Sequence, residues 1–404
     1  MEYIKLTFVG DVMCQKELLD AFKIKDGFSF DSAFNRILPM LKESDLSCAN
    51  LETPISYDDS DLSNRLYNFS SPIEFAHAVK NAGFSFVATA NNHCLDRNTT
   101  GIASTVKGLD SVGLVHTGVF SSKSQDRLVC MNIDGLKIGF LAYTYGTNAF
   151  ANNNYLKRSE RWMVNMLQAQ ELSNPISRYC FHHQGGRASR LYNKVRRHLH
   201  FRNYGCQVYE RKEADYFQKL RISKDIKQLK KKGADIIVFY MHVGGQYNPK
   251  ATARTLQITE FLRKQGANII VGSHEHVVHG CSNNFLSENS VETYSLGNFF
   301  DTTGVTSPPF DKMSEYSIVW HVYVDKATKR IAKTSYTICK SVLQEGEKQK
   351  IEVVPVYDLM QSEMDAGNRE ALWKDMQTIA YKFAKQKIDN PQLEYYYYLN
   401  SATL

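Results

Sequence analysis

The sequence lacks several features that would assign it to a special class of protein. Only 9 prolines and 23 glycines occur in 404 residues, which excludes a collagen-like or low-complexity chain. No apolar run is long enough for a membrane-spanning helix. The first residues show no basic region, apolar run or cleavage site of a signal peptide. With 43% hydrophobic and 12% aromatic residues, the chain has the composition of a globular protein with a sizeable core.

The cysteines also lack the pattern of a disulfide or structural zinc protein. All eight lie far apart, and none forms a Cys-x-x-Cys pair. A chain of this length does not depend on disulfides for stability. We therefore expect free thiols, a reducing cytoplasmic location and no membrane anchor.

Helical and strand patterns alternate along the chain. A helix predicted at 252–265 is followed by Gly266 and an apolar strand at 268–271, and a lysine-rich helix precedes the strand at 236–240 in the same way. This order predicts an α/β fold with a largely parallel sheet. Asp134-Gly135 between two apolar runs predicts a hairpin, so the sheet system should be mixed.

Two further helices are predicted from local signals near the N-terminus. Apolar residues at helical spacing predict a helix over 33–41. Ser71-Pro72-x-Glu74 has the form of a capping box, and Gly83 would end the helix that it starts.

The rhythm of these units breaks in two places. Residues 146–218 lack clean periodicity and are rich in Asn, Arg, Tyr and His, which indicates an insertion. Residues 341–404 contain a strand-like run at 351–356 and a helical pattern at 369–387. We predict one domain over 1–340 that carries the insertion, and a C-terminal extension, partly helical, that packs on the core.

Polar side chains follow five of the predicted strands, and each stands at the carboxyl end. Such ends form the rim at which α/β sheets bind ligands. Taken singly, Gly10-Asp11 or the paired asparagines could be turns, and a lone histidine could be a hydrogen-bonded core residue. Together they indicate a site, whose candidates are Asp11, Glu52, Asn91, Asn92, His93, His242, His274 and His276.

The mixture of donors points to metal chemistry. Oxygen donors (Asp11, Glu52, Asn92) together with imidazoles (His242, His274, His276) suit a pair of Mn²⁺, Zn²⁺ or Fe ions. One bridging carboxylate can hold two ions and so activate a water for attack on a phosphoryl or acyl centre. His93 then remains as a general acid or oxyanion stabiliser, with Asp96 placed to orient its ring.

The same residues resemble the CapA capsule-synthesis family, a poly-γ-glutamate branch of the metallophosphatase-like proteins. The matching motifs run in order from about residue 3 to 325, and they are Gly10-Asp11-Val12-Met13, Asn50-Leu51-Glu52, Ala90-Asn91-Asn92-His93 with Asp96, Met241-His242-Val243-Gly244, Gly272-Ser273-His274-Glu275-His276-Val277 and Tyr294-Ser295-Leu296-Gly297-Asn298-Phe299.

The resemblance implies a four-layer αββα sandwich with two metal ions at one rim. By that similarity Asp11 and His276 would hold one ion, and Glu52 would bridge it to the other. The second ion would be held by Asn92, His242 and His274. Asn91 and Asn298 become candidate substrate-binding residues.

Two residues depart from the family pattern. Met13 stands where metallophosphatases carry a histidine, which predicts that the first ion is weakly held or absent. Glu275 replaces the usual proline between the two histidines.

The excess of positive charge is concentrated in one segment. The formal net charge is +7, and residues 172–209 hold seven basic residues and no Asp or Glu. Such a run could be a solvated face or a flap that brings Arg187 and Arg190 over an anionic substrate. No nucleic-acid-binding motif accompanies it.

Three functions follow from these patterns. The first is a CapA-like metal-dependent hydrolase acting on an anionic phosphoester or on a γ-glutamyl or other acyl polymer. The second is a non-catalytic accessory protein that binds an anionic capsule polymer, with the capsule-synthesis machinery as its partner. A nucleic-acid phosphodiesterase is the third.

Overall fold

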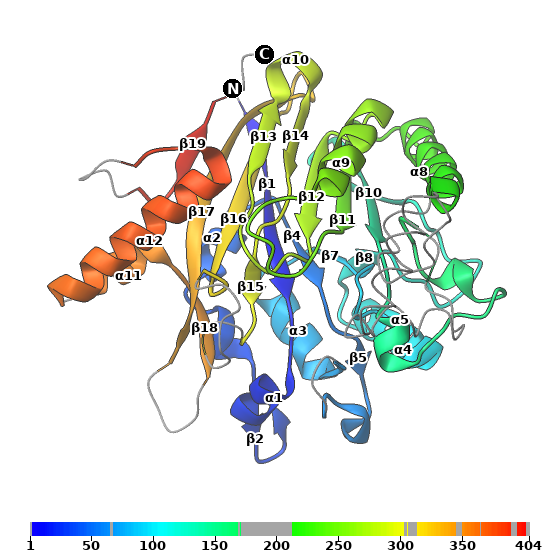
Figure 1. Cartoon of the computed structure of the whole chain (residues 1–404), viewed down its shortest axis with the longest axis horizontal. Helices are drawn as coiled ribbons and strands as arrows, with labels where there is room; N and C mark the ends of the chain where they lie inside the picture. The colour runs from blue at the N-terminus through cyan, green and yellow to red at the C-terminus, as the bar shows by residue number, and fades with distance from the viewer. Residues whose placement is uncertain are drawn as a thin grey trace, which may run out of the picture.

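The computed structural model describes residues 2–64, 68–168, 170, 212–302, 305, 313–344, 350–363, 365–388 and 394–400. These residues form a mixed α/β structure with two large sheets (Figure 1). The α/β class predicted from the sequence is confirmed.

The larger sheet has nine strands. Its main path runs β18-β17-β16-β1-β4-β7-β8, with β15 beside β1 and β19 beside β17. The strands from β1 to β8 are parallel, whereas β16, β17 and β18 are antiparallel. Their bounds are β1 Tyr3–Val12, β4 Leu46–Leu51, β7 Phe86–Ala88, β8 Val115–Thr117, β15 Asn298–Phe300, β16 Tyr316–Asp325, β17 Ile331–Leu343, β18 Ile351–Pro355 and β19 Tyr397–Leu399.

The smaller sheet has six strands in the order β13-β14-β12-β11-β10-β9. Its central strands β10, β11, β12 and β14 are parallel, and β9 and β13 are antiparallel edges. Their bounds are β9 Val129–Ile133, β10 Leu136–Thr144, β11 Ile236–His242, β12 Ile269–Ser273, β13 Cys281–Asn284 and β14 Ser290–Thr293. The hairpin predicted at Asp134-Gly135 is confirmed, because it joins β9 to β10.

Short elements and helices complete the described fold. Two-residue strand pairs join β2 Lys23–Ile24 to β3 Gly27–Phe28 and β5 Ile55–Ser56 to β6 Ser71–Pro72. The helices are α1 Lys16–Phe22, α2 Leu38–Lys42, α3 Ile73–Asn81, α4 Asn98–Ser111, α5 Ala149–Asn152, α8 Lys212–Lys231, α9 Ala253–Gln265, α10 Phe285–Glu288, α11 Val356–Ser362 and α12 Ala366–Ala384, and the 3₁₀ turns are η1 Asp31–Phe34, η2 Asp59–Asp61 and η3 Arg161–Met163.

The two sheets pack face to face around a buried aromatic core. Phe86 of β7 stacks on Phe140 of β10 with ring centroids 4.2 Å apart, so the contact joins one sheet to the other. Phe8 of β1 and Tyr240 of β11 make a second contact of this kind at 6.3 Å. Alternation along each strand sends the neighbouring side chains to the outer faces.

Helices cover those outer faces. Val9 and Val12 of β1 join a cluster with α1, α2 and α3, whereas Phe239 of β11 joins one with α8 and α9. The described core is therefore layered as helices, sheet, sheet and helices. In Figure 1, α8 and α9 lie on the right. On the left, α12 packs through Ile379 and Phe383 on strand residues such as Tyr336, within the same cluster as the core between the sheets and not on an outer face.

Two local predictions near the N-terminus are wrong. The segment 33–41 is not one helix, because η1 and α2 share it and a turn separates them. Ser71 does not cap α3: Pro72 is the N-cap residue without a side-chain cap bond, and the Ser71 hydroxyl instead bonds Thr53 Oγ1 at 2.7 Å.

Other expectations can be compared only over the described residues. The six cysteines that the structure describes are free thiols, as expected. No helix within the described ranges is both long and apolar enough to cross a membrane. The predicted insertion 146–218 is described up to 168, at 170 and again from 212, where α8 begins.

Candidate metal and acid–base site

The candidate residues gather where the carboxyl ends of both sheets meet. Asp11 lies near the end of β1, Glu52 directly follows β4, and His242 ends β11. The amide of Glu52 donates to the carbonyl of Val12 at 2.9 Å, which ties these two strand ends together. All of these side chains are buried.

Glycine allows one of these strand ends to come close to a neighbouring segment. A Cβ on Gly10 would lie 1.9 Å from the carbonyl oxygen of Gly297, so any larger residue would force β1 away. This approach sets Asn298 beside Asp11 in parallel register. The Gly10-Asp11 pair is therefore part of a close strand contact, and not a turn.

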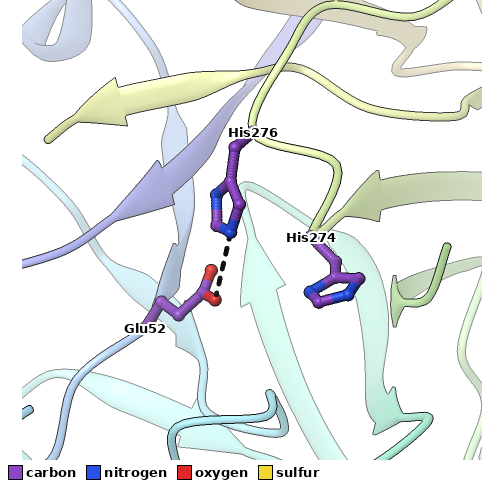
Figure 2. A group of neighbouring side chains, drawn as sticks. All are labelled: Glu52, His274 and His276. Atoms are coloured by element: carbon purple, nitrogen blue, oxygen red, sulfur yellow. Dashed lines mark ion pairs between the residues drawn. The ribbon is translucent and has the colours of Figure 1, made fainter. Parts of the chain in front are cut away.

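Glu52 stands at the centre of the site. Two groups of side chains offer donor atoms within 4.8 Å of one another, and both contain Glu52. Asp11 and His242 complete one group, and His274 and His276 complete the other (Figure 2). This grouping differs from the expected partition, in which Asp11 shares an ion with His276, although His276 Nδ1 also lies 3.3 Å from Asp11 Oδ2.

An asparagine that we did not predict as a site residue links the two carboxylates. Asn50 donates through Nδ2 to Asp11 Oδ1 at 2.7 Å and to Glu52 Oε2 at 3.1 Å. It alternates with Glu52 across Leu51 at the end of β4, so both side chains lie on the same side of the strand. The motif Asn50-Leu51-Glu52 contained this signal.

Both histidines after β12 adopt unusual backbone conformations. His274 has φ 97° and His276 has φ 59°, in the left-handed region that non-glycine residues rarely occupy. Such strain persists where the surroundings enforce it, commonly at functional sites. Figure 2 shows the His276 ring pointing at the Glu52 carboxylate and the His274 ring to one side of this pair.

The electrostatics of the site couple these carboxylates to imidazoles. Burial alone favours neutral Asp11, but the hydrogen bond and charge of His276 lower the pKa of Asp11 below its usual value. Burial opposes a charged His276, but Glu52 and Asp11 outweigh it and raise the pKa of His276 to about 10. Burial and the neighbouring His242 and His276 hold the pKa of His274 well below its usual value. The buried carboxylates thus require a positive charge beside them.

This donor set fits a metal ion. Within the described residues, Glu52 Oε1 and His274 Nδ1 are buried and have no hydrogen-bond partner. A buried acceptor without a partner costs about 1–3 kcal/mol, and a cation at this point would remove that cost. Carboxylate, amide and imidazole donors are the ligands expected for Mn²⁺, Zn²⁺ or Fe.

Asn92 connects the site to a second pair of residues. Its Oδ1 lies 2.7 Å from His242 Nε2, and its amide donates to Asn148 Oδ1 at 3.3 Å. The next residue, His93, places Nδ1 2.7 Å from Asp96 Oδ2, and both side chains are buried. Because Nδ1 is engaged with the carboxylate, the Nε2 atom of His93 is the one left for chemistry.

Asp96 is held by groups that sequence reasoning missed. Phe69 donates its amide to Asp96 Oδ2 at 2.7 Å, and Asn152 donates to Oδ1 at the same distance. The Phe69 ring also stacks on His93 at 4.0 Å. Asn152 lies within the predicted insertion, whose first part therefore belongs to the site; its richness in asparagine was the available signal.

The remaining candidates fall in two groups. Asn91 supports the site from behind, because it donates to the carbonyl of Leu51 at 2.7 Å. Asn298 accepts from His276, with its Oδ1 2.9 Å from Nδ1 of that ring. Arg187 and Arg190 lie outside the described residues.

Three relatives give the comparison with known proteins. Capsule biosynthesis protein CapA of Bacillus anthracis is 25% identical over 321 residues, which cover 78% of this chain and 64% of that protein. PGA biosynthesis protein CapA of Bacillus subtilis (strain 168) is 23% identical over 325 residues, or 78% of this chain and 68% of the relative. Uncharacterized protein y4sH of Sinorhizobium fredii is 30% identical over 123 residues, covering 29% of this chain and 25% of the relative. The chain thus spans less than two thirds of the B. anthracis protein.

A family comparison covers most of the fold and every described candidate residue. The model of the bacterial capsule synthesis protein PGA_cap matches residues 5–303. That range runs from β1 to the segment after β15 and includes Asp11, Glu52, His93, His242 and His276. The chain belongs to the bacterial capsule synthesis protein family PGA_cap, which has a metallophosphatase-like fold.

Proposed function

We propose that this chain is a metal-dependent hydrolase that acts on an anionic polymer in capsule or poly-γ-glutamate biosynthesis. The observation that carries the proposal is the meeting of two buried assemblies: the donor set around Glu52 and the His93–Asp96 pair. Asn92 and Asn148 join them, since Asn148 Nδ2 lies 3.5 Å from His93 Nε2. A site for polarising a substrate thus lies beside a site for proton transfer.

The metal ligands in this proposal are Asp11, Glu52, Asn92, His242, His274 and His276, and two divalent ions are the proposed number. Bound ions would supply Lewis-acid polarisation of a phosphoryl or acyl group and a hydroxide at neutral pH. Asn50 keeps the Asp11 and Glu52 carboxylates oriented through its two hydrogen bonds.

His93 is the proposed general acid. Asp96 holds the Nδ1 proton, so the ring presents Nε2 and can carry a proton there for the leaving group. The stacked Phe69 ring and Asn148 fix the ring plane. Asp96 therefore acts as a positioning residue and His93 as the group that touches the substrate.

The test combines metal analysis with turnover. Purified full-length protein should bind Mn²⁺, Zn²⁺ or Fe, and should hydrolyse either a phosphodiester or a γ-glutamyl oligomer. Glu52→Gln should lose metal and activity, because the neutral amide cannot replace the anionic carboxylate that both donor groups share. A matched control is Glu17→Gln, which changes an exposed carboxylate in α1. A protein that binds none of these metals would contradict the proposal.

One observation favours a non-catalytic alternative. Met13 is buried in the first motif and brings a thioether where a histidine would add a ligand. The chain would then bind an anionic capsule polymer at the rim without cleaving it. Polymer binding that survives both His93→Ala and chelation, with no product formed, selects this alternative.

A further inference from the structure

A cavity in the described structure is lined by none of the metal-ligand candidates. It has a volume of about 350 Å³ and is lined by Lys123, Arg127, Arg161, Trp162 and Arg221. Four of these five residues are cations, and the fifth supplies a flat aromatic surface. We call this cavity the basic pocket.

The basic pocket is built from segments distant in sequence. Arg127 donates to the carbonyl of Trp162 at 2.6 Å and to Asn165 Oδ1. Arg221 of α8 reaches the same Oδ1 at 3.3 Å. The Arg127 guanidinium also lies over the Phe120 ring, 4.0 Å from its centroid. Arg127 is thus fixed in place by neutral partners.

No ion pair neutralises these four cations in the part of the chain that the structure describes. Carboxylates close in sequence have other partners. Asp126 pairs with Lys232 at 2.6 Å, Asp225 accepts from the Tyr143 hydroxyl, and Glu160 accepts from the Lys157 amide at 2.8 Å.

Like charges gathered without a direct ion pair carry an electrostatic cost. Burial, together with the neighbouring Arg221, lowers the pKa of Arg127 to about 10, and the nearby Asp225 only partly opposes this shift. An anion in the cavity would remove this repulsion. Guanidinium groups bind carboxylates and phosphates in a bidentate manner, and several of them favour a ligand with more than one negative charge.

The basic pocket lies close to the metal-ligand candidates along the sheet. Thr144 at the end of β10 donates its amide to the carbonyl of Asn165, and Thr144 is in register with His242. Asn165 is therefore two strand spacings from His242, about 10 Å. A single glutamate unit cannot reach from one to the other, whereas an extended oligomer can.

We propose that the basic pocket is a second binding subsite for a carboxylate-bearing oligomer whose scissile group lies at the metal centre. Its cations contact carboxylates one or two units away from that group, and Trp162 packs on the methylene groups between them. This inference rests on the proposed function, from which it takes the polymer as substrate.

The subsite is tested by equilibrium binding of a labelled γ-linked glutamate oligomer. Fluorescence anisotropy measures the binding, with EDTA present and at low ionic strength. Lys123→Gln/Arg161→Gln removes two exposed cations and should weaken binding about tenfold. The matched control, Lys224→Gln/Lys227→Gln, removes two exposed cations of α8 outside the pocket and should leave the affinity within about twofold.

Two further arms complete the experiment. Free glutamate should bind equally weakly to both double variants, because a single unit is too short to engage the separate subsite. Adenosine triphosphate serves as the phosphate-bearing competitor; if it binds the pocket more tightly than the oligomer, the assignment to a carboxylate oligomer is overturned. Equal oligomer affinity of the pocket and control variants overturns the subsite itself.

The outcomes separate this inference from the proposed function. Hydrolysis that depends on metal, with oligomer affinity unaffected by Lys123→Gln/Arg161→Gln, contradicts the inference alone. Pocket-dependent binding by a protein that shows no metal-dependent hydrolysis contradicts the proposed function alone.

Discussion

The two sheets deliver different chemistry to the same rim. The nine-stranded sheet supplies mainly oxygen donors: Asp11 near the end of β1, Glu52 after β4 and the amide of Asn92 after β7. The six-stranded sheet supplies imidazoles, His242 from β11 and the histidines after β12. Oxygen ligands alone suit Mg²⁺ or Ca²⁺, and imidazoles shift the preference to transition metals.

The metal site can therefore form only when the two sheets pack against each other. Glu52 takes part in both donor groups, but each group also needs a histidine from the other sheet. The aromatic contacts between the sheets, such as Phe86 on Phe140, therefore hold the ligand halves at a fixed separation. Packing in the core and chemistry at the rim are parts of one arrangement.

Removing Glu52, the donor that both groups share, should have the largest effect on metal binding and hydrolysis. Glu52→Gln is expected to lower hydrolysis by about 10⁴-fold, because the anionic donor common to both groups is lost. The measurement is kcat/KM together with bound metal. A variant with wild-type metal content and activity would show that the two sheets do not share this carboxylate.

The next effect concerns proton transfer alone. His93→Ala should keep bound metal but lower turnover about 10³-fold, since the general acid is lost while the donor set remains. The exposed His77 of α3 offers a matched control, and His77→Ala should retain activity. Loss of metal from His93→Ala would instead make His93 a ligand.

The docking of the sheets can be weakened directly. Phe140→Ala removes a fully buried ring at the sheet–sheet contact and should lower the free energy of unfolding by about 3–5 kcal/mol. Metal affinity should fall as well, because the two ligand halves are less firmly held. Phe140→Leu, which keeps more volume, should show smaller changes in both denaturation and metal titration. If Phe140→Ala is destabilised but its metal affinity is unchanged, the packing of the core does not control the metal site.

A histidine outside the site should have the smallest effect, which concerns how protein stability depends on pH. His321 of β16 is buried against Thr7, and burial together with Lys5 lowers its pKa well below the usual value. Below about pH 6.5 the unfolded chain binds a proton that the folded chain does not, so stability falls as pH decreases. His321→Gln should reduce the slope by up to about 1.4 kcal/mol per pH unit. Parallel pH profiles of denaturation for wild type and variant would contradict this.

Sequence reasoning found the strand ends because their signal is local. An apolar run followed by Asp11, Glu52 or His242 is visible without a fold, and the rim of an α/β sheet follows from topology. It missed Asn148 and Asn152 because their contacts with His93 and Asp96 span more than fifty residues. The capping box failed because Ser71 meets Thr53 in space, a partner that no local pattern reveals.

The charge pattern shows the same limit. Counting along the chain places the positive excess in residues 172–209 and leaves the rest formally balanced. That balance hides the basic pocket, because its cations come from three separated segments and nearby carboxylates are bound elsewhere. A neutral sum over a sequence does not exclude a strongly charged cavity in the fold.

Anomalous diffraction at the metal edge, from crystals of the full chain grown with Mn²⁺ or Zn²⁺, tests the central claim most directly. We predict a peak of anomalous density between the sheets, about 2.0–2.3 Å from Glu52 and from at least one of His242, His274 and His276. Absence of any peak there, or a peak bound by residues of one sheet alone, would contradict it.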